Sequence, residues 1–137
     1  MINCPFVVPF LLTIETMVGI KGKILVVDDE HLVRWSVCRM LEAEGFETVE
    51  ASSGREALQV MQNEQVWILI TDLMMPEMSG IELIRRARID NPDLGILVIT
   101  AIDSPGPIDS ALQAGAVHTF TKPIPFDELV GTIQRMA

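Results

Sequence analysis

Five short apolar runs lie between residues 23 and 121, and each has the length and composition of a buried β-strand. The first run is almost continuously apolar, which is typical of a strand covered on both faces of its sheet. The second run alternates between polar and apolar residues and therefore predicts an edge strand. The predicted strands are Lys23–Val27, Glu47–Ala51, Val66–Thr71, Ile96–Ile99 and Val117–Thr121.

Helical patterns fill the intervals between these strands. The first predicted helix, His31–Glu44, ends before Gly45, a residue type that commonly terminates helices. Two further helices open with a serine that is followed three residues later by a glutamate, at Ser53 and at Ser79, which is capping-box spacing. Helical periodicity predicts the buried faces of the first and third helices, formed by Val33, Val37, Met40 and Leu41 and by Ile81, Leu83, Ile84 and Ile89.

The last two helices are less regular in sequence. Residues 103–107 contain two prolines and a glycine, which predicts a stiff, irregular loop followed by a short helix from Pro107 to Ala114. The last helix is predicted to begin near Asp127. Because strands and helices alternate throughout, we expect an α/β protein with a parallel sheet, right-handed crossovers and helices on both faces.

Composition limits the classes of function. At 137 residues and 49% hydrophobic content, the chain can form one domain with a sizeable core. Its net charge of -9 argues against direct binding of nucleic acid, which depends on lysine and arginine meeting phosphates. Cys4 and Cys38 form no zinc-ligand pattern, so we expect a reduced, cytoplasmic environment with Cys38 in the core.

Residues 1–20 are predicted to be an apolar extension ahead of a domain at residues 21–137. The apolar stretch Pro5–Leu12 is too short for a membrane span, and no lysine or arginine precedes it as in a secretory signal. Two interpretations stay open. Either Met17 is the true start of the protein, or the extension packs on an apolar surface of its own domain or of a second copy.

A reactive polar group follows four of the five predicted strands: the pair Asp28-Asp29, then Asp72, Thr100 and Lys122. The carboxyl ends of parallel strands face one crevice, where ligands bind, so these groups should meet. Three carboxylates against one lysine leave excess negative charge, which favours a bound cation. Oxygen ligands together with a phosphate suit Mg²⁺.

The same groups meet the needs of phosphoryl transfer, which depends mostly on positioning and charge stabilisation. The Thr100 hydroxyl can donate to a phosphoryl oxygen, and Lys122 can pair with another. Asp72 is the candidate nucleophile because it stands alone at a strand end, and carboxylates form aspartyl phosphates in known enzymes. Each signal is weak alone, since acidic pairs are common at helix N-termini. Their order along four strand ends makes the set specific.

Over residues 23–137 the chain resembles the response-regulator receiver domains of two-component signalling. The resemblance implies a flavodoxin-like, doubly wound sheet of five parallel strands in the order 2-1-3-4-5. Arg34-Trp35 is similar to the receivers of NtrC-like transcription activators. The motifs that carry the family resemblance are Val26-Val27-Asp28-Asp29-Glu30, Thr71-Asp72, Met75-Pro76, Ser79-Gly80, Thr100-Ala101, Gly115-Ala116 and Lys122-Pro123.

The resemblance also implies a function. Asp72 would be the phosphoacceptor, Thr100 would sense the phosphoryl group, and Lys122 would pair with it ahead of a cis Lys122–Pro123 bond. The donor would be a sensor histidine kinase, and the output would pass through an effector domain or output protein. The chain would catalyse only its own phosphorylation and slow dephosphorylation, and homodimerisation stays open.

A magnesium site is implied in the same way. Asp29 and Asp72 would bind Mg²⁺ directly, with Asp28 assisting and the backbone carbonyl of Met74 as a further ligand. A hydrolase with a covalent aspartate would usually carry a second acid two residues beyond its nucleophile, where this chain has Met74. A nucleotide-binding P-loop is also absent from the sequence.

One position departs from the family pattern. Thr119 stands where receivers usually carry tyrosine or phenylalanine, three residues before the lysine. By strand alternation Phe120 points to the opposite side from Thr119 and is predicted to lie in the core. His118 is predicted to be a surface or strand-edge residue. Thr119 and the proline-rich stretch after Thr100 motivate an alternative function, a receiver-like interaction scaffold that works without phosphorylation.

Overall fold

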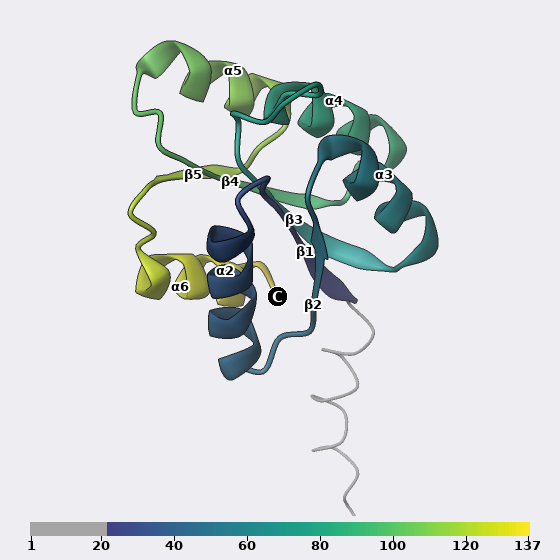
Figure 1. Ribbon diagram of the computed structural model, residues 1–137, viewed down its shortest axis with the longest axis vertical. Coiled ribbons are helices and arrows are strands. Elements are labelled where there is room, and N and C mark those ends of the chain that lie inside the picture. The colour runs from purple at the N-terminus through teal and green to yellow at the C-terminus, as the bar shows by residue number, and fades with distance from the viewer. Residues whose placement is uncertain (1–21) are drawn as a thin grey trace, which may run out of the picture.

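The computed structural model describes residues 22–137, and the predicted extension at residues 1–20 lies outside this range. Within it, five strands alternate with five helices (Figure 1). No helix of residues 22–137 is long and apolar enough to cross a bilayer. The elements are β1 (Lys23–Val27), α2 (His31–Ala43), β2 (Thr48–Ala51), α3 (Gly54–Asn63), β3 (Val66–Thr71), α4 (Gly80–Asp90), β4 (Gly95–Thr100), α5 (Pro105–Ala114), β5 (His118–Thr121) and α6 (Phe126–Met136).

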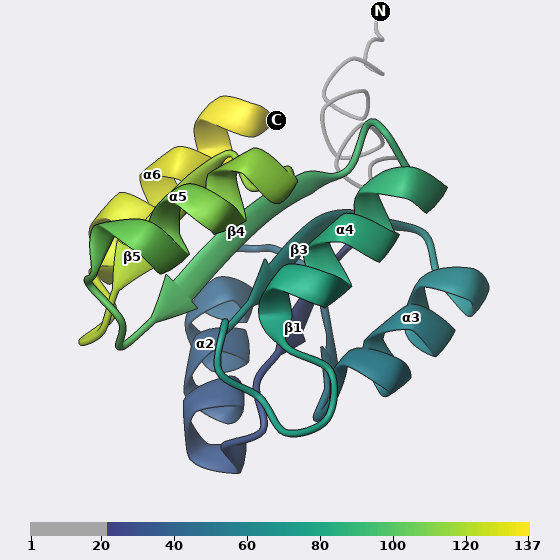
Figure 2. The ribbon, with the colours of Figure 1, turned by 90° about the horizontal axis from the view of Figure 1, so that it is seen from above.

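The sheet has the strand order β2-β1-β3-β4-β5, and every neighbouring pair is parallel. This order confirms the predicted doubly wound topology, and it places β2 at an edge as its alternating sequence indicates. Helices α2 and α6 cover one face of the sheet and α3, α4 and α5 cover the other (Figure 1). On the second face α4 lies between α3 and α5, as Figure 2 shows.

Strand alternation divides the core into two layers. On β1, Ile24 and Val26 belong to the layer beneath α2 and α6, whereas Leu25 and Val27 belong to the layer beneath the other three helices. The predicted burial of Cys38 is confirmed, since it lies in the first of these layers. Because β1 is buried on both faces, it holds the residues that follow it in a fixed place between the two layers.

The helix caps show why the serine–glutamate spacing predicted the helix starts correctly. The Ser53 hydroxyl accepts a hydrogen bond from the Glu56 N–H at 3.1 Å, and Ser79 accepts one from the Glu82 N–H at 3.3 Å. The Glu56 carboxylate returns to Ser52, accepting from its N–H at 2.6 Å and from its hydroxyl at 2.9 Å. These bonds satisfy donors that a helix N-terminus otherwise leaves unpaired.

Two residues assigned to buried helix faces are exposed. Met40 of α2 is 41% exposed, because the buried face of this helix is centred on Val37, Cys38 and Leu41. Ile89 of α4 is 78% exposed and lies on the side of the helix opposite the buried Leu83, Ile84 and Ala87. A small residue completes the buried face in both helices, Cys38 in α2 and Ala87 in α4. A pattern of large apolar side chains does not include these positions.

The predictions for α5 and β5 were wrong at their first residues. Helix α5 begins at Pro105, so the proline-rich stretch forms its first turn and not an irregular loop. Prolines are tolerated in a first turn because the N–H groups there have no partner within the helix. Strand β5 begins at His118, and Val117 is 55% exposed before it.

Candidate functional site

The ends of β1, β3 and β5 place three charged side chains at one edge of the sheet. Val27 at the end of β1 is in register with Thr71 at the end of β3, and the Asp72 N–H donates to the Val27 carbonyl at 3.3 Å. Lys122 follows β5, and its N–H donates to the carbonyl of Thr100 at the end of β4 at 2.8 Å. These backbone bonds bring the residues that follow each strand within reach of one another.

The ammonium of Lys122 lies between two buried carboxylates. Its Nζ is 3.0 Å from Oδ2 of Asp72 and 3.3 Å from Oδ2 of Asp28, and a longer contact of 3.6 Å joins it to the exposed Glu30. Asp28 is 4% exposed and Asp72 is 7% exposed. A buried carboxylate requires such a partner, because burial of an unpaired charge is costly.

The remaining carboxylate oxygens accept hydrogen bonds from the backbone. Oδ1 of Asp28 accepts from the Glu30 N–H at 2.9 Å, and Oδ1 of Asp72 accepts from the Met74 N–H at 3.2 Å. Each carboxylate is therefore held at one oxygen by its own loop and at the other by Lys122. This arrangement fixes the direction of both side chains within the crevice.

The electrostatics of the site reflect this sharing of one positive charge. Burial raises the pKa of Asp28 above its usual value, and the opposing effects of the Glu30 N–H and of Lys122 do not cancel it. Burial lowers the pKa of Lys122, but its hydrogen bond to Asp72 and the charges of Asp72 and Asp28 outweigh burial and raise it overall. Lys122 therefore stays an ammonium ion at neutral pH, and its single charge is shared by two buried carboxyl groups.

The side chains of Asp29 and Thr100, also predicted for the site, lie outside the ion-paired group of Asp28, Asp72 and Lys122. Asp29 is exposed, and within residues 22–137 no three histidine, cysteine, aspartate or glutamate side chains are arranged to hold a metal ion. Thr100 is buried at the end of β4, and its hydroxyl accepts from the Ile102 N–H at 3.2 Å. The structure thus brings the charged groups of Asp28, Asp72 and Lys122 together, and Thr100 ends β4, the strand between those that Asp72 and Lys122 follow.

The donor set fits a hard cation. Two carboxylates against one ammonium leave one negative charge in a buried crevice, and their oxygen atoms are the ligands that Mg²⁺ prefers. Asp29 is next to Asp28 in the chain and is exposed to solvent beside the buried pair. Charge and ligand type therefore favour Mg²⁺.

Arg34 has a structural role at the site that the sequence did not predict. Its guanidinium donates to the backbone carbonyl of Asp28 at 2.7 Å and to the Glu50 carboxylate at 2.9 Å. The available signal was an arginine in the first turns of a helix that directly follows an acidic pair. Arg34 was used only as a subgroup marker.

Phe120, the neighbour of Thr119, lies in the core as predicted. Phe120 is 5% exposed and belongs to the core layer beneath α2 and α6. Its ring stacks on the exposed His118, with centroids 4.5 Å apart and an interplanar angle of 16°. The Lys122–Pro123 peptide bond is cis, as the resemblance implied.

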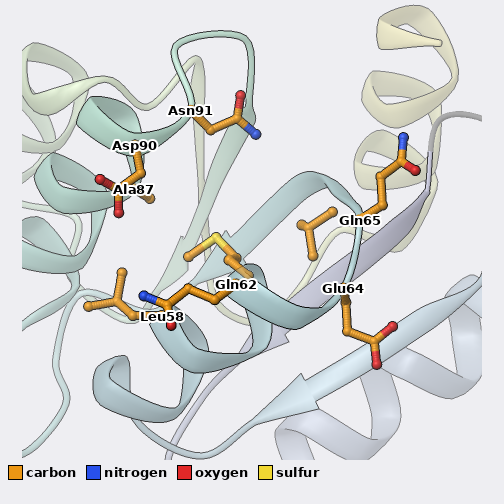
Figure 3. A pocket seen from close by; sticks show the side chains of 9 residues that line it. Leu58, Gln62, Glu64, Gln65, Ala87, Asp90 and Asn91 are labelled. Carbon is orange, nitrogen blue, oxygen red and sulfur yellow. The ribbon is translucent and has the colours of Figure 1, made fainter.

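A separate cavity of about 300 Å³ lies between the ends of α3 and α4 (Figure 3). Leu58, Gln62 and Asp90 are among the residues that line it. The cavity also borders Val66, the first residue of β3, whereas Asp72 follows the last. Six strand residues span about 20 Å, so this cavity is not part of the acidic crevice.

Comparisons with known proteins agree on one family. The model of the response regulator receiver domain family matches residues 24–134. The response regulator MprA of Mycolicibacterium vanbaalenii is 38% identical over 114 residues, which is 83% of this chain and 49% of that protein. The MprA of Mycobacterium leprae is 38% identical over 83% of this chain and 50% of its own length. The chain thus spans about half the length of the curated relatives it matches.

Solved structures lead to the same family. The chemotaxis protein CheY4 of Vibrio cholerae has a TM-score of 0.79 and 32% identity, covering 85% of this chain and 98% of its own. The response regulator TrrA of Thermotoga maritima, solved in complex with Mg(2+)-BeF, has a TM-score of 0.77 and 32% identity, covering 84% and 98%. The chain therefore belongs to the response regulator receiver domain family, the phosphoacceptor modules of two-component signalling.

These relatives do not confirm the predicted NtrC-like subgroup, and they give no support to the phosphorylation-independent scaffold.

Proposed function

We propose that Asp72 is the residue that accepts the phosphoryl group, from a phosphohistidine on a sensor kinase. The observation that carries the proposal is the pair of contacts from Lys122 Nζ to Asp72 and Asp28, at 3.0 Å and 3.3 Å. They support it because the proposed nucleophile, a second buried acid and a lysine ammonium then share one edge of the sheet. An ion pair with only a surface role would not require both carboxylates to be buried.

The transfer exchanges one bond for another. A carboxylate oxygen of Asp72 attacks phosphorus, a new P–O bond forms, and the P–N bond to the donor imidazole breaks with its electron pair going to nitrogen. Lys122 pairs with the charge that collects on the phosphoryl oxygens. The Thr100 hydroxyl, which accepts a hydrogen bond from the Ile102 N–H, donates its own hydrogen to one of these oxygens. Slow attack by water on the acyl phosphate then regenerates Asp72.

Mg²⁺ is the proposed cofactor, held by Asp28, Asp29 and Asp72 with the backbone carbonyl of Met74. When bound, the ion would neutralise charge on the phosphoryl oxygens. Lys122 alone supplies one positive charge against two buried carboxylates. A dianionic phosphoryl group could not be held there without further positive charge, so a divalent ion suits the site.

The proposed partners are a sensor histidine kinase and an effector domain or output protein, in the cytoplasm. An open, mostly apolar depression of about 370 Å³ borders Lys122 and is lined by Leu32, Ile124 and Phe126 among others. Leu32 is 74% exposed. An apolar surface beside the acceptor would let a donor protein dock while its histidine reaches Asp72.

Incubation with acetyl phosphate and Mg²⁺ tests the proposal. We expect intact-protein mass spectrometry to show the addition of one phosphoryl group. The adduct should be lost in Asp72→Ala and when EDTA is added. Asp103→Ala is the matched control, because Asp103 is an exposed aspartate shortly after Thr100, and this variant should still be labelled. Labelling that persists in Asp72→Ala would contradict the assignment of the acceptor, and no labelling with any donor would favour the scaffold.

A further inference from the structure

Arg34 of α2 makes contacts that a solvent-facing helix residue does not require. Its side chain is 13% exposed, and all three guanidinium nitrogens have partners. Nη1 donates to the Asp28 carbonyl at 2.7 Å, Nε donates to Glu50 at 2.9 Å, and Nη2 lies 3.2 Å from Nδ1 of His31. One side chain thus joins the end of β1, strand β2 and the first turn of α2.

The bond to Asp28 meets a specific need of the backbone. Strand β1 ends at Val27, and its pairing with β2 ends there too. The carbonyl of Asp28 therefore lies past the paired part of the strand. Arg34 satisfies the Asp28 carbonyl, and the buried Oδ1 of Asp28 binds the Glu30 N–H. Glu30 in turn is the N-cap residue of α2, and its side chain makes no capping hydrogen bond to the helix. The turn that carries both acidic residues is therefore held from one side by Arg34.

The geometry points to Arg34 as a positioning residue for the cation site: it holds the Asp28-Asp29 turn so that both carboxylates can bind the ion. Glu50 orients the planar guanidinium, whose rigid fork of donors holds a carboxylate and a carbonyl in fixed directions, whereas the donors of an ammonium rotate freely. This inference rests on the proposed function, because it assumes that a divalent ion binds at Asp28, Asp29 and Asp72.

The charge of Arg34 and its positioning role predict opposite changes in Mg²⁺ affinity when Arg34 is removed, so the direction of the change tests the inference. Arg34 is a cation close to the proposed Mg²⁺ site, and like charges repel. If Arg34 acted only through its charge, its removal would strengthen Mg²⁺ binding. If it acts by holding the turn, its removal weakens binding. Loss of an outer partner of this kind typically lowers metal affinity by about 10- to 100-fold.

The experiment is calorimetric titration of the whole chain with Mg²⁺, for wild type, Arg34→Gln, Arg34→Lys and Glu50→Gln. We expect affinity about tenfold weaker in Arg34→Gln, also weaker in Arg34→Lys, and less affected in Glu50→Gln. The Mg²⁺ concentration needed for half-maximal labelling by acetyl phosphate should shift by the same factor. Thermal unfolding in EDTA identifies any variant that does not fold, and Arg34→Lys tests the inference if Arg34→Gln fails.

Arg39→Gln is the matched control. Arg39 lies on the same helix, but it pairs with Glu42 and stacks over Trp35 instead of contacting the acidic turn. Its removal should leave Mg²⁺ affinity unchanged. Arg34→Gln with equal or tighter Mg²⁺ binding would overturn the positioning role while leaving the proposed function intact. Failure of the wild type to bind Mg²⁺ would instead overturn the proposed function, and with it this inference.

Discussion

Charge balance at single residues determines what the crevice can do. Asp28 and Asp72 are buried, and Lys122 between them supplies one positive charge. Burial raises the pKa of Asp28, so this carboxyl is protonated more readily than an exposed aspartate. The site is therefore held together by its lysine, and it gains stability from any added cation that pairs with both carboxylates.

Replacement of Lys122 tests this balance. Lys122→Gln should lower the free energy of unfolding at pH 7 by about 3 kcal/mol, because two buried carboxylates then lose their shared positive partner. The deficit should shrink with added Mg²⁺ and as the pH falls, since protonation of Asp28 removes the repulsion. Urea unfolding at pH 7 and pH 5, with and without Mg²⁺, measures both effects.

Lys23→Gln is the control for this substitution. The Lys23–Glu64 ion pair is 3.0 Å long but exposed to solvent, so its loss should change stability far less than the loss of Lys122. Equal effects of the two lysine substitutions would contradict the buried-charge argument.

The first residue of α4, Gly80, packs directly against the backbone that follows β3. Helix α4 approaches the backbone after β3 so closely that a Cβ on Gly80 would overlap the Asp72 carbonyl oxygen and lie 2.7 Å from Cα of Leu73. The Gly80 N–H also donates to the Leu73 carbonyl at 3.0 Å. A residue without a side chain is therefore required for the helix to press against the acceptor.

Gly80→Ala should destabilise the domain by about 2 kcal/mol, as overpacking against rigid backbone does. It should also slow Mg²⁺-dependent labelling of Asp72, because the strand end must shift. Gly106→Ala in α5 is the matched control, since a Cβ there meets nothing within 4 Å. Alanine at that position should stabilise the helix by up to about 1 kcal/mol. Chemical denaturation and mass spectrometry give the two readouts, and a stable, normally labelled Gly80→Ala would refute the close-packing argument.

The cap of α3 gives a pH-dependent effect. Hydrogen bonds from the backbone and side chain of Ser52 lower the pKa of Glu56 below its usual value. Its contribution to stability is therefore full above the pKa of the unfolded chain and is lost as the pH falls through the lowered folded-state pKa. Glu56→Gln should cost about 0.5 kcal/mol at neutral pH and almost nothing at strongly acidic pH.

Glu82→Gln serves as the control for the cap, since Glu82 forms only an exposed ion pair with Arg86 beyond its backbone bond to Ser79. Denaturation curves at several pH values compare the two variants. A constant deficit for Glu56→Gln across the pH range would contradict a charged cap.

For the whole molecule, the sequence predicted the architecture because local and global signals agree. Apolar runs, capping serines and Gly45 defined the elements, and polar strand ends predicted the meeting of Asp28, Asp72 and Lys122. What the sequence could not provide depends on side-chain direction. Arg34 could have faced solvent, and only its contacts across β1 and β2 connect it with the site. The exposure of Ile89 likewise depends on how α4 is rotated against the sheet.

The two core layers lead to a prediction about the domain boundary. All the buried residues of the described chain lie between Ile24 and Ile133, and both layers share β1 and β3. A variant that begins at Lys21 should therefore fold in one cooperative step, with a free energy of unfolding within about 0.5 kcal/mol of the full chain. Trp35 and Trp67 remain in this variant and report unfolding by fluorescence. Mg²⁺-dependent labelling of Asp72 should be unchanged. A substantial loss of stability would show instead that residues 1–20 pack on the domain, because only burial of their apolar side chains could account for it.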